Sequence, residues 1–348
     1  MNDDSSTGSP TSTGRWPTAG DDLETRRIAI FLALAFGISW AMAAVIYATG
    51  GLVDSPELVP GITLALILLA LPYMWGPAIA HVLTRLLTGE GFGWNRTFLH
   101  PQIRHGWPYW IAAWLAPVGL IVLGAAVWFL AFPAQFGGLD AVAEMLAEAE
   151  AEAGQEIPLS PAVFVLVQLV AVLALAPLIN SFSAFGEEFG WRAYLLPKLA
   201  PLGLRRALLI HGVIWGVWHW PVIAMGHNYG LEYPGFPWAG MGVFLVSTVA
   251  MGTFLGWLTL RSGSVWPATI GHAVINGSAG LALIFAYDVP NQVLGPTPAG
   301  LIGILPWIVV AVALLAKPTW LGPAEPPALL GSDADPDEKS DEEGTRLA

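Results

Sequence analysis

Residues 183–198 read SAFGEEFGWRAYLLPK, and this stretch decides how the chain can fold. Glu187, Glu188 and Arg192 bring three charges into a region whose flanking runs are almost wholly apolar. An ionisable side chain inside a membrane segment costs free energy unless it is paired, so it marks a functional site by default. The stretch therefore predicts a transmembrane helix that carries a specific polar site.

The composition is typical of a membrane protein. The 348 residues are 55% hydrophobic and only 11% charged, which differs from the usage of soluble globular domains. Cysteine is absent, which excludes disulfide bonds, a thiolate nucleophile and thiolate metal ligands. The formal net charge of −12 argues against nucleic acid as a partner and says little about the membrane core. The apolar composition makes the lipid bilayer the expected surrounding.

Apolar runs long enough to cross the hydrocarbon layer as a helix, about 20 residues, occur eight times. They cover 28–49, 59–84, 107–132, 161–185 (which continues to about 196), 207–226, 239–260, 264–286 and 299–316. The fold class that we expect is therefore all-α, a polytopic transmembrane bundle of about eight spans within residues 27–318. The tails, 1–26 and 319–348, are polar and acidic, which predicts disorder.

The basic residues predict the orientation of this bundle. Apart from Arg192, every Lys and Arg falls in a segment that the layout puts on one face, whereas the loops of the other face carry acidic residues and no basic ones. Basic residues accumulate in cytoplasmic loops, so both termini are predicted to be cytoplasmic and the protein is expected in the cell membrane. The largest loop of the other face, 133–160, contains an Ala- and Glu-rich segment, 140–156, without a strong apolar stripe, which predicts a solvated helix.

The three charges of the opening stretch have different predicted roles. Glu188 and Arg192 are four residues apart with Glu first, which is the favourable spacing and order for an ion pair on a helix. We expect this pair to support the site by fixing the helix. Glu187 points about 100° away from Glu188 and has no partner on its own helix, so Glu187 is the candidate for chemistry.

Other polar side chains are expected at the same depth in the membrane as Glu187. His219, His272 and Asn276 lie deep within two later spans, and Asn276 is one turn from His272 on the same face. At 1.5 Å per residue, these groups and Glu187 lie roughly 16–22 Å from the basic residues at the inner face. Four polar side chains from three helices are therefore predicted to meet near the middle of the membrane.

The chemistry of this set is that of hydrolysis. A carboxylate and an imidazole, Glu187 and His219, can deprotonate a water and later protonate a leaving amine, and His272 with Asn276 can donate hydrogen bonds to an oxyanion. We therefore expect hydrolysis of a peptide bond in a membrane-associated peptide or protein, with no cofactor. The alternative is a zinc site made of Glu187, His219 and His272, although the chain contains no H-E-x-x-H pattern.

Two non-hydrolytic classes also stay open from the residues alone. A membrane immunity or scaffold protein would use the polar groups only for packing. A transporter would use them as a proton relay near the middle of the membrane, although the chain has no detectable internal repeat of the kind many transporters have.

Three blocks, in this order, resemble the CPBP family (CAAX proteases and bacteriocin-processing enzymes), whose best-known members are the type II CAAX prenyl endopeptidases. The likeness covers about residues 160–290. The blocks are Glu187-Glu188-x-x-x-Arg192, Trp215-x-x-x-His219 and His272-x-x-x-Asn276. The family pattern usually has Phe before the first His, so Trp215 is a departure from it.

The resemblance implies a role for each matched residue. Glu187 would be the water-activating carboxylate, His219 its catalytic partner, and His272 with Asn276 the oxyanion site. The second Glu and the Arg of the first block would support them. The resemblance implies a glutamate protease without a metal more strongly than a metalloprotease.

Overall fold

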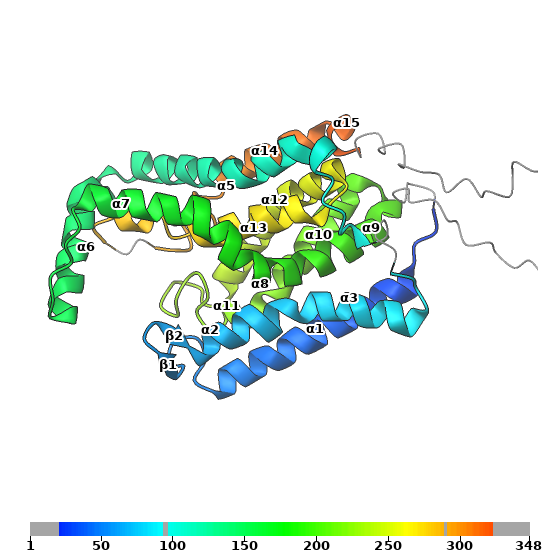
Figure 1. Ribbon diagram of the computed structural model, residues 1–348, viewed down its shortest axis with the longest axis horizontal. Coiled ribbons are helices and arrows are strands. Elements are labelled where there is room, and N and C mark those ends of the chain that lie inside the picture. The colour runs from blue at the N-terminus through cyan, green and yellow to red at the C-terminus, as the bar shows by residue number, and fades with distance from the viewer. Residues whose placement is uncertain (1–20, 93–96, 289–290, 323–348) are drawn as a thin grey trace, which may run out of the picture.

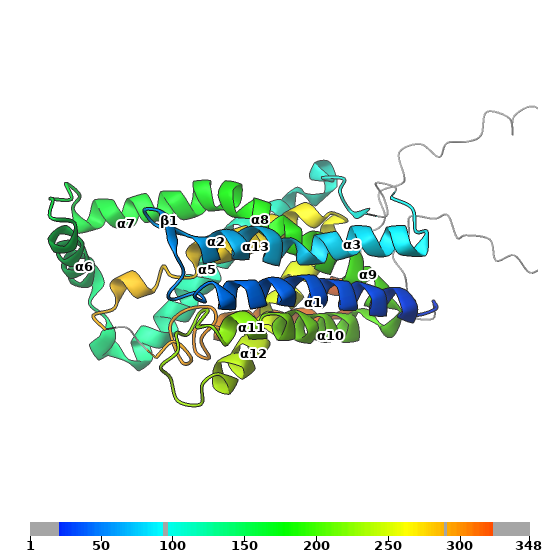
Figure 2. The same ribbon diagram turned by 90° about the horizontal axis from the view of Figure 1, so that it is seen from below.

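The protein is described by a computed structural model over residues 21–92, 97–288 and 291–322, so nearly all of both predicted tails lies outside the described residues. Most helices run along one direction, and the first and last described residues lie at the same end of the bundle (Figure 1). Seen from below, α1 runs beside α10 along this direction (Figure 2). The predicted all-α class is confirmed.

The elements follow one another from the N-terminal side. Within the described residues the helices are α1 Thr25–Ala48, α2 Leu64–Leu68, α3 Met74–Thr88, α5 Ile103–Ala131, α6 Gly138–Ala153, α7 Pro161–Val170, α8 Ala176–Gly190, α9 Leu196–Leu199, α10 Leu204–Trp218, α11 Trp220–Ile223, α12 Trp238–Ser262, α13 Val265–Ser278, α14 Leu305–Ala316 and α15 Pro318–Leu321. The π-helical turns are η1 Leu69–Tyr73, η3 Ala171–Leu175 and η4 Trp191–Leu195, and the 3₁₀ turns are η2 Pro133–Gln135, η5 Ala200–Leu202 and η6 Leu283–Phe285. Strands β1 Glu57–Val59 and β2 Ile62–Thr63 pair antiparallel in a short hairpin.

Six helical segments of the described chain are long and apolar enough to cross a membrane: Thr25–Ala48, Leu64–Thr88, Ile103–Ala131, Pro161–Leu202, Trp238–Ser262 and Val265–Phe285. The chain is therefore an integral, multi-pass membrane protein. Helices α10 and α14 also run along the bundle but have only 15 and 12 residues, fewer than a full span needs. The count of eight spans and the cytoplasmic side of the termini stay predictions.

Where a proline or a π-helical turn interrupts the regular helix, a backbone carbonyl accepts a hydrogen bond from a side chain of another helix. Pro77 has no N–H for the carbonyl of Tyr73 one turn before it, and the hydroxyl of Ser39 on α1 donates to that carbonyl at 2.9 Å. The carbonyl of Phe189, just before the π-helical turn η4, accepts from Nδ1 of His81 on α3 at 2.7 Å. The irregular turns thus tie α1, α3 and α8 together around the charged stretch.

Helix α8 lies very close to α3 at two glycines. A Cβ atom on Gly186 would lie 2.8 Å from the carbonyl oxygen of Met74, and one on Gly190 would meet the ring of Pro77. The charged residues between these glycines are consequently covered by helix rather than by lipid. The main hydrophobic core of the protein includes the fully buried rings of Trp191 and Trp218.

The Ala- and Glu-rich segment predicted as a helix does form one, α6, at the end of the bundle opposite the described termini (Figure 1). Its acidic side chains alternate with apolar residues, and Val142 and Leu146 are buried. Helix α6 therefore packs one side against the protein, so the expectation of a solvated helix without an apolar stripe is wrong for that side.

Candidate active site

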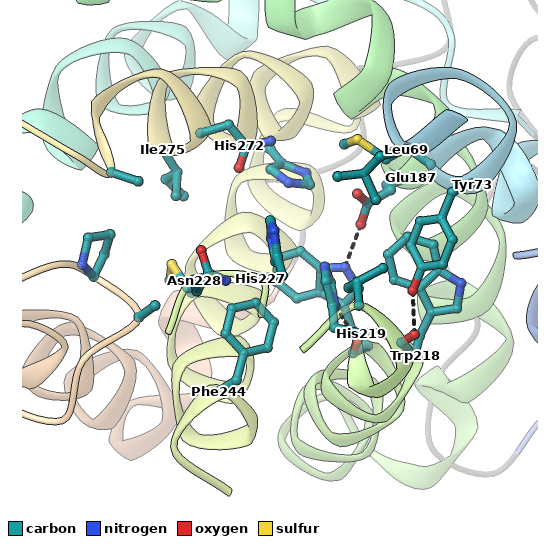
Figure 3. Close-up of a pocket in the computed structure, with 18 residues that line it drawn as sticks. Leu69, Tyr73, Glu187, Trp218, His219, His227, Asn228, Phe244, His272 and Ile275 are labelled. Atoms are coloured by element: carbon teal, nitrogen blue, oxygen red, sulfur yellow. Dashed lines mark hydrogen bonds between the residues drawn. The ribbon is translucent and has the colours of Figure 1, made fainter. Parts of the chain in front are cut away.

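The predicted site residues meet in one cavity. Glu187 on α8, His219 at the end of α10, and His272 and Asn276 on α13 line a space of about 260 Å³ (Figure 3). Glu187, His219 and His272 are buried, whereas Asn276 is exposed. The convergence that the depths predicted is therefore present, and it gathers a carboxylate, two imidazoles and an amide.

The partner of Glu187 comes from another helix. The indole Nε1 of Trp215 on α10 donates a hydrogen bond to Oε2 of Glu187 at 2.7 Å (Figure 3). One turn later, Nδ1 of His219 lies 2.8 Å from the carbonyl oxygen of Trp215. A carbonyl can only accept, so Nδ1 of His219 carries the proton. The neutral ring then has an unprotonated Nε2 that can accept a proton.

The predicted supporting pair is present and has a third member. Nη1 of Arg192 lies 2.7 Å from Oε1 of Glu188, and both side chains are fully buried. The same oxygen lies 2.7 Å from Nδ1 of His272. The sequence did not predict this second contact, because no spacing rule links α8 to α13. Glu188 therefore holds both the guanidinium and the imidazole.

The contact between Glu188 and His272 fixes where the imidazole proton lies. A carboxylate accepts, so Nδ1 of His272 donates to it, and a neutral ring would leave Nε2 unprotonated. With both carboxylates ionised and Arg192 protonated, the formal charge of Glu187, Glu188 and Arg192 is −1. One further proton, held by a histidine or by Glu187, makes the buried group neutral, and burial favours a neutral group.

Helix α10 ends at Trp218, immediately before His219. Side chains from the N-terminal helices form hydrogen bonds to the backbone at this helix end. Pro221 has no N–H to continue the helical hydrogen bonds. The carbonyl oxygen of Trp218 accepts from Oη of Tyr73 at 2.7 Å and from Nε1 of Trp40 at 3.1 Å. The sequence analysis missed Tyr73 and Trp40, because aromatic residues in an apolar span look like ordinary core residues.

The sequence analysis also missed His227, which lies in a loop near the end of a predicted span. His227 and Asn228 also line the cavity (Figure 3). Burial lowers the pKa of His227 to about 4, so this imidazole is neutral near pH 7. His227 directly follows the predicted span 207–226, and nothing in the sequence of that span or its loop indicates that the loop lines a cavity.

The alternative zinc site can be compared with this geometry. The described residues contain no group of three His, Asp or Glu side chains arranged to hold a metal ion. One oxygen of Glu187 accepts from Trp215 and one nitrogen of His272 binds Glu188. These contacts still leave one ligand atom free on each of the three side chains, as the outer partners of metal ligands also do, so the zinc site stays the alternative prediction.

Comparison with known proteins supports the same region. Residues 160–278, which run from α7 to α13, match the family described as type II CAAX prenyl endopeptidase Rce1-like. A relative from Methanococcus maripaludis, named CAAX prenyl protease 2, is 34% identical over 93 residues, which are 26% of this chain and 34% of the relative. The match thus spans about a third of the length of that curated relative. These findings confirm the resemblance to the CPBP family.

Proposed function

We propose that this protein is an intramembrane endopeptidase that hydrolyses a peptide bond with a water activated by Glu187 and His219. The observation that carries the proposal is the cavity that these two residues line together with His272 and Asn276. The similarity to a CAAX prenyl endopeptidase family over residues 160–278 supports the same reaction class.

In the proposed reaction, the free oxygen of Glu187 removes a proton from a water, and the water oxygen attacks the peptide carbonyl. The carbonyl becomes an oxyanion, and its collapse breaks the C–N bond. The leaving amine receives a proton, which Glu187 or Nε2 of His219 can deliver, because both groups can exchange protons in one cavity. Water supplies all the atoms that the two products gain.

His272 must be in one particular protonation state to act as an oxyanion donor. Because Nδ1 of His272 is held by Glu188, His272 can donate to an oxyanion only through a protonated Nε2, that is, as an imidazolium. Glu188 lies where it stabilises that charge, and such a donor is more effective than a neutral one. The amide of Asn276 on the same helix face is the proposed second donor. The proposal needs no metal cofactor.

The substrate that we propose is a membrane-associated peptide or protein, since its cleaved bond must reach a cavity inside a membrane protein. The relative's name refers to CAAX prenyl substrates, so a peptide with a prenylated CAAX end is the first candidate to assay with purified protein. A peptide without the prenyl group is the matched control for the need for a lipid anchor.

The experiment that tests the proposed function compares membrane proteomes of three strains: one that makes the wild-type protein, one that lacks it, and one that makes Glu187→Ala at an equal level. We expect the same uncleaved precursors to accumulate in the second and third strains. If the Glu187→Ala strain processes every precursor that the wild type processes, the protein is not a protease that depends on Glu187.

A further inference from the structure

Trp215 contacts four members of the proposed active site. Its Nε1 donates to Glu187 at 2.7 Å, and its carbonyl accepts from Nδ1 of His219 at 2.8 Å. The guanidinium carbon of Arg192 lies 4.1 Å from the centre of its ring system, and the ring of His272 meets it edge-on at 5.4 Å. The indole is therefore held on several sides while its N–H points at one carboxylate.

From these contacts we propose that Trp215 is a positioning residue for Glu187. A carboxylate with neither oxygen held can turn about its last side-chain bond, and both oxygens then face the cavity only part of the time. The indole N–H binds Oε2, so Oε1 is the oxygen left to face a water in the cavity. This inference rests on the proposed function, because it assigns the job of base to Glu187.

The rigidity of the donor is part of the argument. Arg192 is fully buried and its guanidinium faces the indole of Trp215, an arrangement that attracts a cation to the ring. Glu188 fixes Arg192 in turn through its ion pair. The pair predicted to be a support would therefore act on catalysis through Trp215, because it orients the ring that orients Glu187.

The chain offers a matched pair of substitutions. Trp215→Phe keeps an aromatic ring at the position where the family pattern has Phe, but it removes the N–H donor. Trp218→Phe removes the same atoms from another wall of the cavity, where the ring meets His219 edge-on at 4.7 Å. Among the described residues, Nε1 of Trp218 has no hydrogen-bond partner. The two variants thus separate the loss of a hydrogen bond from the loss of packing.

The kinetic experiment uses purified full-length protein and a cleaved peptide substrate. Because a catalytic group that is misplaced by even a small distance loses rate, we expect Trp215→Phe to lower kcat by about tenfold or more with KM little changed. Trp218→Phe should lower kcat by a clearly smaller factor. Equal losses in the two variants, or a wild-type kcat in Trp215→Phe, would overturn the positioning role.

A second measurement does not depend on activity. The indole N–H resonances of the 17 tryptophans can be recorded by NMR in detergent, and the signal missing in Trp215→Phe belongs to Trp215. We expect Glu187→Ala to move this signal and to leave the signal of Trp218 nearly unchanged. An unmoved Trp215 signal means that the hydrogen bond does not exist and the inference is wrong.

The two measurements also separate this inference from the proposed function. If the Trp215 signal moves in Glu187→Ala but wild-type protein cleaves no membrane peptide, the hydrogen bond stands and the peptidase assignment fails. If the wild type cleaves peptide and the signal does not move, the peptidase assignment stands and the role of Trp215 fails.

Discussion

The part of the protein that the structure describes has two clusters of charged residues. Both contain ion pairs of nearly the same N–O distance, but the two clusters differ in how deeply they are buried. The buried cluster lines or adjoins the cavity and consists of Glu187, Glu188, Arg192 and His272. The end cluster lies where α1 begins, α3 ends and α9 runs, and consists of Glu24, Arg27, Glu90 and Lys198. Both clusters join separate helices, so the distances alone do not say what either one does.

The ion pairs show the contrast. Glu188 and Arg192 are 2.7 Å apart and fully buried. Lys198 lies 2.6 Å from Glu90 and from Glu24, and the side chains of these three residues are 10%, 12% and 36% exposed, so water reaches this cluster mainly at Glu24. Removing one charge from a buried pair strands the other in a dry interior, whereas water replaces a partner lost at an exposed site. Burial, rather than proximity, decides which cluster is costly to disturb.

The largest effect that we expect is on activity and concerns Glu187, the carboxylate of the buried cluster that has no ion pair among the described residues. Glu187→Gln keeps the shape and can still accept the hydrogen bond from Trp215, but it cannot take a proton from water. Peptidase activity should fall by about 10²- to 10⁴-fold, while the yield of folded protein stays normal. Wild-type cleavage rates in well-folded Glu187→Gln protein would remove Glu187 from the role of base.

The next effect is on stability. Arg192→Ala removes the partner of Glu188 and the cation beside Trp215, so we expect a loss of about 3–5 kcal/mol in the free energy of unfolding. The measurements are the folded fraction after purification and the melting temperature in detergent. A melting temperature equal to that of wild type would show that Glu188 is not stranded when Arg192 is lost.

The matched control lies in the end cluster. Lys198→Ala leaves Glu24 with Arg27, and Glu90 with Arg27 and Arg85, so its cost should be about 1 kcal/mol or less. Burial raises the pKa of Glu24, but hydrogen bonds from Lys198 and Arg27 lower it by more, so the pKa lies below its usual value of 4.5. The stabilisation is therefore present above about pH 4.5 and should fade as acid protonates Glu24.

These clusters also explain how much the sequence could predict. Helical spans and the ion pair of Glu188 with Arg192 follow from hydropathy and i, i+4 spacing, which are local properties. The meeting of Glu187, His219 and His272 followed from equal depth in the membrane. Contacts such as His272 with Glu188 could not be predicted, because they depend on how α13 rotates against α8, and one sequence contains no rule for rotation.

The helices before residue 160 show the same limit. Tyr73 and Trp40 hold the carbonyl of Trp218, but they lie outside the matched residues 160–278 and within apolar runs. A tyrosine in such a run is as compatible with packing as with a hydrogen bond, so its pattern carries no information about its partner. The end cluster was predicted only as a set of basic residues on one face, and its acidic partners were not.

The smallest expected effect is that of a metal chelator. A zinc site would need Glu187, His219 and His272 as ligands, each with a lone pair directed at one point. In the structure, Trp215 binds one oxygen of Glu187, Glu188 binds Nδ1 of His272, and the described residues contain no group of three such side chains arranged to hold an ion. Activity of purified protein after exhaustive chelation should therefore stay within about twofold of the untreated value, with Glu187→Gln as the inactive reference for the assay. If purified active protein contains stoichiometric zinc, and activity is lost on its removal and restored by zinc alone, the three side chains must rearrange into a ligand set. The contrast between the two clusters would then be that of a metal site and an ion-pair network.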